Sequence, residues 1–421
     1  MTNPELPTPA PHTPGNSRGA YASAGVTNSQ LPLSSRERVA QALRHTEPDR
    51  VPTDFLATPE IWKRLNDHLQ LAPAAPELAD YIDPAREAIM RHFEIDMRLL
   101  SYDMFCRPPE SRMLPGAVVD WWGTMNRSTP NRMWRQRLED GTFLDIWGTH
   151  GKIVYNQFGG YEEFASWPLS FASSADELKD HPWPQPDWWD FSPLPWLVQQ
   201  LDPDKKYWLR FRIGSVFEIA WQLRGMQEFL IDLAATPEIP HYIMSRLGEV
   251  YVENTRRVLD LIGDRLDMVY FYDDVATQNS LMISPDMWRS FVRPHHVKLV
   301  ELAHSRGLKV MYHCDGAIYP LIPELIEMGI DLLNPIQPDA KNMDGRKLKR
   351  EFGDRLAFHG GIDINHTLPQ GTPDEVRAEV RDRVQNLGQG GGYVMASSHH
   401  IQPDTPVENI LAMYETALRY R

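Results

Sequence analysis

The chain has 421 residues, 42% of them hydrophobic, and a formal net charge of -14 at pH 7. This acidic balance, without a cluster of Lys and Arg, excludes a nucleic-acid backbone as the expected partner. There is no apolar run of membrane-spanning length, no apolar signal segment at the start, and no disulfide framework, since Cys106 and Cys314 are the only cysteines. We therefore expect a soluble protein of the reducing cytoplasm. It should form roughly two or three ordinary domains, or one α/β barrel with insertions.

The first stretch, 1–33, is rich in Pro, Ser, Thr, Asn and Gly and has no apolar periodicity. Such a composition cannot bury enough surface to offset its ordering entropy, so we predict a disordered tail. A targeting peptide is the less favoured interpretation, because Arg18 is the only Lys or Arg in the stretch. The ordered part, 34–421, begins where Ser34 and Glu37 have the spacing of a helix capping box.

The stretch from about 104 to 190 differs from the rest, because it is dense in Trp, Pro and Gly with little helical period. Residues 134–146 alternate across Asp140-Gly141, which predicts a β-hairpin. We predict an aromatic-rich insertion that carries this hairpin. A substrate lid is one role for it, although the packing of aromatic rings between irregular loops is the favoured interpretation.

Strand and helix patterns alternate at βαβ spacing from residue 207 onward. The predicted strands are 208–213, 268–272, 309–312, 332–334, 356–358 and 393–396. The predicted helices are 226–233, 240–262, 286–305, 318–328, 345–352, 372–387 and 406–420. With an earlier strand at 51–55 and a helix at 81–93, this repeat predicts a single (β/α)8 TIM barrel. An open doubly wound sheet is the alternative, but no GxGxxG or P-loop motif supports it.

Polar side chains follow the predicted strands at the points where the strands end. The residues are Asp273, Asp274 and Gln278; His313, Cys314 and Asp315; Gln337; His359 and Asp363; and Ser397, Ser398, His399 and His400. Parallel strands bring such ends to one rim, where neutral His and ionised Asp suit a divalent cation or a proton relay. Alternation places His313 and Asp315 on one side of their strand and Cys314 on the other, as a small buried hydrophobe.

Six stretches form a familiar set. They are RERVAQALRHTEPDRVP (36–52), FYDDVATQ (271–278), SPDMWRSFVRPH (284–295), YHCDGAI (312–318), FHGGID (358–363) and GGGYVMASSHHIQPDTPVENI (390–410). Together they resemble the uroporphyrinogen decarboxylase superfamily, in particular its branch of cobalamin-linked methyltransferases. The resemblance covers nearly everything after Ser35 and implies a single TIM barrel.

The resemblance leaves two activities in competition. True decarboxylases carry an arginine-bearing motif just after the first strand, which holds the carboxylates of the substrate, but DFLATPEIW (54–62) contains no arginine. The zinc methyltransferases carry His-x-Cys-Gly at a strand end and a later Cys. In this sequence His313 matches the histidine of that motif, Asp315 followed by Gly316 matches its Cys-Gly, and His399 matches the later Cys. Both cysteine ligands are therefore replaced, one by Asp and one by His. A His/Asp/His set can still hold zinc with an open fourth position, and iron and manganese also suit this harder site.

The resemblance thus implies a metal-dependent methyltransferase or demethylase. It would move a methyl group from a small O-, N- or S-methylated substrate to a corrinoid (cobalamin) acceptor, expected on a partner protein. The metal, zinc first, would be bound by His313, Asp315 and His399. The substrate would be oriented by Asp273, Asp274 and Gln278, and the proton handled by His359 or His400. Further substrate-binding candidates are Arg212, Gln337 and Asp363.

The alternative activity is that of a metal-free lyase acting on a carboxylated substrate. Its anion contacts would come from Arg210, Arg212, Arg289 and Arg293, although surface salt bridging is favoured for the last two, which lie on a predicted helix. A binding protein without activity is a third class. The oligomeric state is open, with a homodimer among the options.

Overall fold

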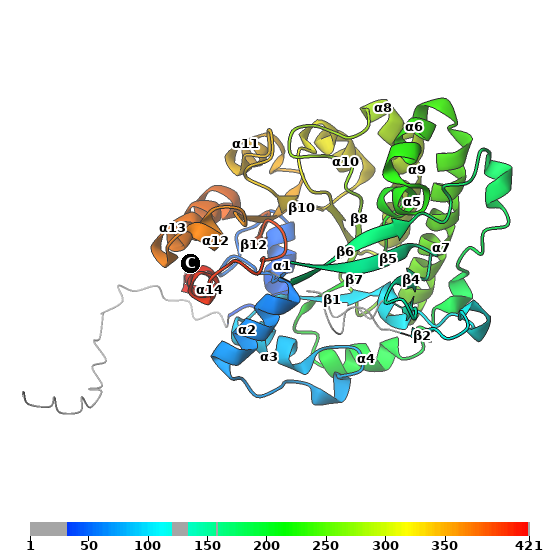
Figure 1. Cartoon of the computed structure of the whole chain (residues 1–421). Helices are drawn as coiled ribbons and strands as arrows, with labels where there is room; N and C mark the ends of the chain where they lie inside the picture. The colour runs from blue at the N-terminus through cyan, green and yellow to red at the C-terminus, as the bar shows by residue number, and fades with distance from the viewer. Residues whose placement is uncertain (1–31, 120–133, 157–158, 420–421) are drawn as a thin grey trace, which may run out of the picture. The chain divides into compact units, whose positions relative to one another are not determined.

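The computed structural model describes residues 32–119, 134–156 and 159–419, and seven parallel strands form its main sheet (Figure 1). In sheet order they are β1 (Met97–Ser101), β7 (Trp208–Arg212), β8 (Met268–Tyr272), β9 (Lys309–His313), β10 (Leu332–Ile336), β11 (Ala357–Ile362) and β12 (Tyr393–Ser397). Most of the tail predicted at 1–33 lies outside the described residues and stays a prediction.

An irregular segment around Thr53 fills the eighth position, between β12 and β1. Asp54 N–H donates to Met395 O at 3.0 Å, and on the other side Asp96 N–H donates to Thr53 O at 3.1 Å. The strand predicted at 51–55 is therefore reduced to single bridges. Pro52 has no N–H to donate, and the N–H of Thr53 goes to the Asp96 carboxylate at 2.8 Å. The parallel sheet thus curls into the predicted TIM barrel.

Helices surround the sheet. They are α1 (Ser35–Leu43), α2 (Pro59–Leu69), α3 (Pro84–His92), α4 (Leu194–Leu201), α5 (Phe217–Arg224), α6 (Met226–Ala235), α7 (Glu238–Ile262), α8 (Pro285–Met287), α9 (Arg293–Ser305), α10 (Ile322–Met328), α11 (Gly345–Phe352), α12 (Thr367–Gln370), α13 (Pro373–Arg383) and α14 (Val407–Arg419). The helix predicted at 286–305 is interrupted by a π-helical turn at 288–292, just before Pro294, whose ring cannot fit an unbroken α-helix. None of the helices in the described residues is long and apolar enough to cross a bilayer.

The insertion forms an antiparallel sheet of its own. Its strands are β2 (Val118–Val119), β3 (Arg135–Arg137), β4 (Phe143–Asp145), β5 (His150–Asn156) and β6 (Gly159–Ser166). The predicted hairpin is confirmed, since β3 and β4 pair with Gln136 opposite Leu144. The longer pair β5–β6 was not predicted, because Gly and polar residues dilute its alternation.

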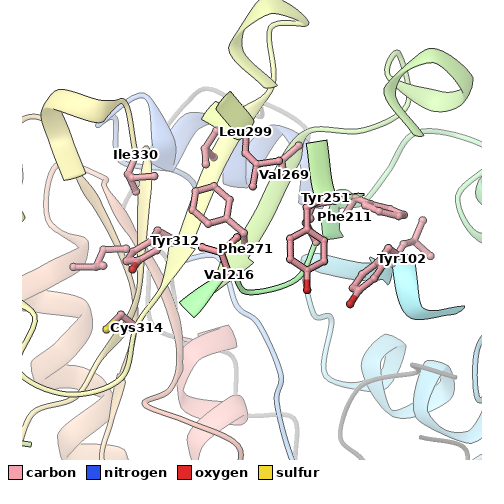
Figure 2. Packing of buried hydrophobic residues seen from close by; sticks show 14 of the residues in the cluster. Tyr102, Phe211, Val216, Tyr251, Val269, Phe271, Leu299, Tyr312, Cys314 and Ile330 are labelled. Carbon is pink, nitrogen blue, oxygen red and sulfur yellow. The ribbon is translucent and has the colours of Figure 1, made fainter. Parts of the chain in front are cut away.

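The barrel strands separate two kinds of environment by alternation. Residues facing outward pack under the helices: Phe271 lies beside Leu299 of α9 (Figure 2), and its ring centroid is 5.5 Å from that of Tyr312. The inward residues at the amino ends make an apolar layer that α1 closes. Its members are Val39, Leu43, Met97, Trp208, Met268, Met311, Leu332, Ala357 and Val394. Two positions further along, the inward residues of most strands are polar.

Candidate metal centre

Three potential metal ligands meet at the carboxyl ends of β8 and β9. They belong to Asp274, His313 and Asp315, and one ligand atom from each lies within 4.8 Å of the others. His313 Nε2 is 3.7 Å from Asp274 Oδ1 and 3.8 Å from Asp315 Oδ2. The register pairs Tyr272 with His313, so these two strand ends lie side by side. The strand-end pattern in the sequence therefore becomes one compact group.

His399, which follows β12, reaches the same group. Its Nε2 lies 3.4 Å from Asp315 Oδ2, and its ring centroid is 6.4 Å from that of His313. A tetrahedral ion with bonds of about 2.0–2.2 Å separates its ligand atoms by about 3.3–3.6 Å. The observed separations are close to this range, so the donor set fits a divalent cation. The mutually close ligand atoms thus belong to Asp274, His313 and Asp315, and His399 approaches this group at Asp315 Oδ2.

Two glutamines hold the Asp315 carboxylate in place. Gln337 Nε2 donates to Asp315 Oδ1 at 2.9 Å, while Gln337 Oε1 accepts from Gly316 N–H at 2.7 Å and from Gln278 Nε2 at 3.2 Å. Gly316 has φ +86°, and a Cβ there would lie 2.5 Å from a backbone carbonyl oxygen, so only glycine fits this turn. Gln278 and Gln337 therefore orient Asp315 and leave its Oδ2 facing the histidines.

Negative charge accumulates around the group. Glu218 Oε1 accepts from Asp274 N–H at 3.1 Å. Burial, followed by the charges of Asp274 and Asp273, raises the pKa of Glu218 well above its usual value. Burial lowers the pKa of His313, but Asp315 and Asp274 outweigh it and leave that pKa raised. A cation bound here would relieve the repulsion between these carboxylates.

His359 lies below the group, inside the barrel. It is fully buried, with Nε2 2.9 Å from Asp54 Oδ2 and Nδ1 2.6 Å from Asn334 Nδ2. Arg210 Nη2 is 2.5 Å from the same Asp54 oxygen. His400 is at the rim, where its ring centroid is 4.8 Å from that of His399.

Asp273 and Cys314 are turned away from the ligand group. Asp273 is fully buried and accepts from Phe217 N–H at 2.7 Å at the start of α5, while His296 Nε2 lies 2.6 Å from its other oxygen. Cys314 packs in the outer core as expected, and burial raises the pKa of its thiol well above the usual value. The structure therefore separates Asp273 from Asp274.

The remaining predicted contacts are engaged with protein groups. Asp363 accepts from Asn365 N–H at 2.7 Å in a turn, and Arg212 pairs with Asp103 at 2.9 Å. Arg289 pairs with Glu324 at 2.8 Å on the surface, which is the salt bridging that its helix position favoured. Substrate binding by Arg212 and Asp363 stays a prediction.

Sequence reasoning missed several members of this region, namely Asp54, Asp103, Glu218 and Asn334. The signal for two of them was available, because Asp103 and Glu218 follow β1 and β7 as the predicted ligands follow later strands. The strand β1 was not predicted, and Glu218 lies on the helix that follows β7 rather than directly at the strand end. Asp54 and Asn334 lie within the barrel wall, where no strand-end rule applies.

The fold and the ligand group together define the class: a parallel α/β barrel with potential catalytic groups at the carboxyl ends of its strands, as in barrel enzymes. The family model described as uroporphyrinogen decarboxylase (URO-D) matches residues 207–420, just over half of the chain. The chain therefore belongs to the uroporphyrinogen decarboxylase family.

Relatives with both activities occur among the similar proteins. A uroporphyrinogen decarboxylase from Chlorobium phaeobacteroides is 25% identical over 185 residues, 42% of this chain and 48% of that protein. The methylcobamide:CoM methyltransferase MtaA of Methanosarcina barkeri is 27% identical over 147 residues, 35% of this chain and 40% of that protein. The chain thus spans less than half the length of either relative. A solved methyltransferase from Methanosarcina mazei matches with TM-score 0.60 and 17% identity, covering 92% of this chain and 99% of the other, which supports the shared fold.

Proposed function

We propose that the protein is a metal-dependent methyltransferase that moves a methyl group from a small O-, N- or S-methylated substrate to a corrinoid acceptor. The observation that carries this proposal is the convergence of Asp274, His313 and Asp315 on one point at the barrel rim, with His399 Nε2 3.4 Å from Asp315 Oδ2. The similarity to a methylcobamide:CoM methyltransferase supports it. In the transfer, the heteroatom keeps the bonding electron pair and takes up a proton, while the methyl group bonds to an electron pair of the reduced corrinoid.

We assign the metal site to His313, Asp315 and His399, and zinc is the metal that we favour. A metal bound there supplies Lewis acidity that makes the heteroatom a better leaving group. Three protein ligands are the number that catalytic zinc sites use, with one position left for substrate. Asp274 is the remaining member of the compact group, so we assign it to orienting the substrate beside the metal.

The other residues act on orientation and on the proton. Gln278 and Gln337 keep the Asp315 carboxylate aimed at the histidines through their hydrogen bonds. His400, which packs against His399 at the rim, is our candidate for delivering the proton. A corrinoid protein would dock at this same rim, and the aromatic-rich insertion would select the substrate.

Metal analysis of purified protein tests the proposal. We expect close to one divalent ion per chain in the wild type and its loss in His399→Ala, together with loss of methyl transfer from methylated donors to cob(I)alamin. His304→Ala is the matched control, because His304 is an exposed histidine that also faces a carboxylate, Asp331, at 3.1 Å. Full metal content and full activity in His399→Ala would remove the proposal.

The metal-free lyase is less well supported by the geometry. A carboxylated substrate needs cations to bind its carboxylates. Two of the arginines predicted for this role, Arg210 and Arg212, are instead paired with Asp54 and Asp103. Decarboxylation by metal-depleted protein would nevertheless favour the lyase over the methyltransferase.

A further inference from the structure

A chain of hydrogen-bonded side chains runs through the barrel lumen from Asp54 to His313. Asp54 Oδ2 lies 2.9 Å from His359 Nε2, and His359 Nδ1 lies 2.6 Å from Asn334 Nδ2. Asn334 Oδ1 then lies 2.6 Å from His313 Nδ1. Asp54, His359 and Asn334 are at most 1% exposed, so water does not compete for these hydrogen bonds.

The direction of the chain is set at the Asp54 end. Burial raises the pKa of Asp54, but Arg210 and His359 outweigh it and hold that pKa at about 2. An ionised carboxylate only accepts hydrogen bonds, so His359 Nε2 must carry a hydrogen and donate it. Burial lowers the pKa of His359, which keeps this imidazole neutral and makes its Nδ1 an acceptor.

The same logic continues to the rim. The amide nitrogen of Asn334 donates to His359 Nδ1, so the amide oxygen of Asn334 is left to accept. Only a hydrogen on His313 Nδ1 can satisfy that oxygen. The other ring nitrogen, Nε2, is the atom that lies 3.7 Å from Asp274 and 3.8 Å from Asp315. A chain running the opposite way would put the hydrogen on Nε2, where it would block a metal.

We propose that Asp54, His359 and Asn334 are positioning residues that hold His313 in the tautomer protonated at Nδ1, so that Nε2 is presented as the ligand atom. Metal-bound histidines commonly donate their second N–H to a carboxylate or carbonyl. Here the carboxylate acts through two intervening side chains. The identity of the ion that Nε2 binds rests on the proposed function. The tautomer itself does not, because it is a property of the metal-free protein.

Long-range proton–nitrogen NMR on chelator-treated protein with 15N-labelled histidine tests the proposal. The His313 signals are identified by their loss in His313→Gln and are read at a pH above the titration of this ring. We expect Nδ1 to carry the hydrogen in the wild type. In Asn334→Ala, His313 loses its acceptor, so the Nε2–H form should appear and zinc affinity should fall about 10–100-fold.

Two variants separate positioning from general damage. Asn334→Asp keeps an oxygen that accepts from His313 Nδ1–H, so it should retain the wild-type tautomer. Asn409→Ala is the matched control, because Asn409 is equally buried and donates to Leu368 O and Gly371 O, both at 2.8 Å, away from the lumen. It should lower stability and leave the His313 signals unchanged.

The proposal is overturned if wild-type His313 carries its hydrogen on Nε2, or if Asn334→Ala leaves the tautomer unchanged. If Asn334→Ala does not fold, Asp54→Asn replaces it, since an amide at position 54 can donate as well as accept and lets the chain run either way. A wild-type Nδ1–H tautomer in a protein that binds no zinc would remove the proposed function and leave the positioning chain standing.

Discussion

The two halves of the barrel lumen are made by the same strands but have opposite character. At the amino ends the inward residues form an apolar layer, with Met311 and Leu332 facing each other on β9 and β10. Two residues further along, the inward pair is His313 and Asn334, joined by a hydrogen bond. Because every second residue of a strand faces inward, one strand contributes an apolar residue to the lower layer and a polar residue to the layer above it. The packed core and the polar side chains of the site therefore occupy different levels along the barrel axis. Substitutions in the two halves should therefore fail in different ways.

The largest effect is expected from breaking the buried charge pair in the polar half. Arg210→Met leaves Asp54 as an uncompensated charge at 1% exposure, and we expect a loss of about 3–5 kcal/mol in the free energy of unfolding. Urea denaturation followed by circular dichroism measures it. The surface variant Arg289→Ala should cost far less, because solvent screens an exposed ion pair. Equal losses in the two variants would contradict the importance of the buried pair.

A cavity in the apolar half should cost stability without affecting the site. Leu332→Ala removes a fully buried side chain from the layer closed by α1, and we expect a loss of about 2–5 kcal/mol. Zinc affinity, measured by chelator competition on the folded variant, should stay within about twofold of the wild type. A drop in affinity comparable to that of a ligand variant would show that the two halves are not separable.

The reverse result is expected for a polar residue at the rim. Gln337→Leu removes the donor to Asp315 Oδ1, so the carboxylate loses its fixed orientation and zinc affinity should fall about 10–100-fold. The thermal unfolding temperature of the metal-free protein should be lowered less than in Leu332→Ala, because Gln337→Leu leaves polar partners such as Gly316 N–H unpaired but opens no cavity in the apolar layer. Gln136→Leu, in the insertion, offers a buried glutamine as control. Unchanged zinc affinity in Gln337→Leu would contradict the orienting role.

The smallest effect concerns acid stability and arises outside the lumen. Burial and the nearby charges of His296 and Lys298 lower the pKa of His295 from 6.5 to about 4, although the charge of Asp273 acts in the opposite direction. The unfolded chain then binds more protons than the folded chain between these values. The contribution of His295 to the free energy of unfolding is thus fully present above pH 6.5 and is lost as the pH falls towards 4. At pH 5.5 the loss should be about 1 kcal/mol. His295→Gln should flatten this part of the pH profile in denaturant titrations. A wild-type profile that is already flat between pH 7 and 5.5 would contradict the lowered pKa.

The sequence predicted the regular part of the fold well. The strand β8 and the helix α11 have the predicted bounds, because their apolar periods are uninterrupted and turn residues flank them. His313 and His399 each approach Asp315, at 3.8 and 3.4 Å, since strand ends share a rim whenever the strands are parallel, and their role as ligands stays a prediction. Strand β1 and the pair β5–β6 were missed, because short strands with mixed polarity leave a weak period.

The sequence by itself determined the parallel barrel and the residue types at its rim, since both follow from repeats of period two and 3.6 that are local in the chain. Only the tertiary structure decided which of those residues lie close together and which pair with one another. The hydrogen bond between Asp54 and His359 joins residues 305 positions apart, and it forms only because the segment around Thr53 closes the barrel. Contacts of that kind depend on register and closure, which no local pattern records.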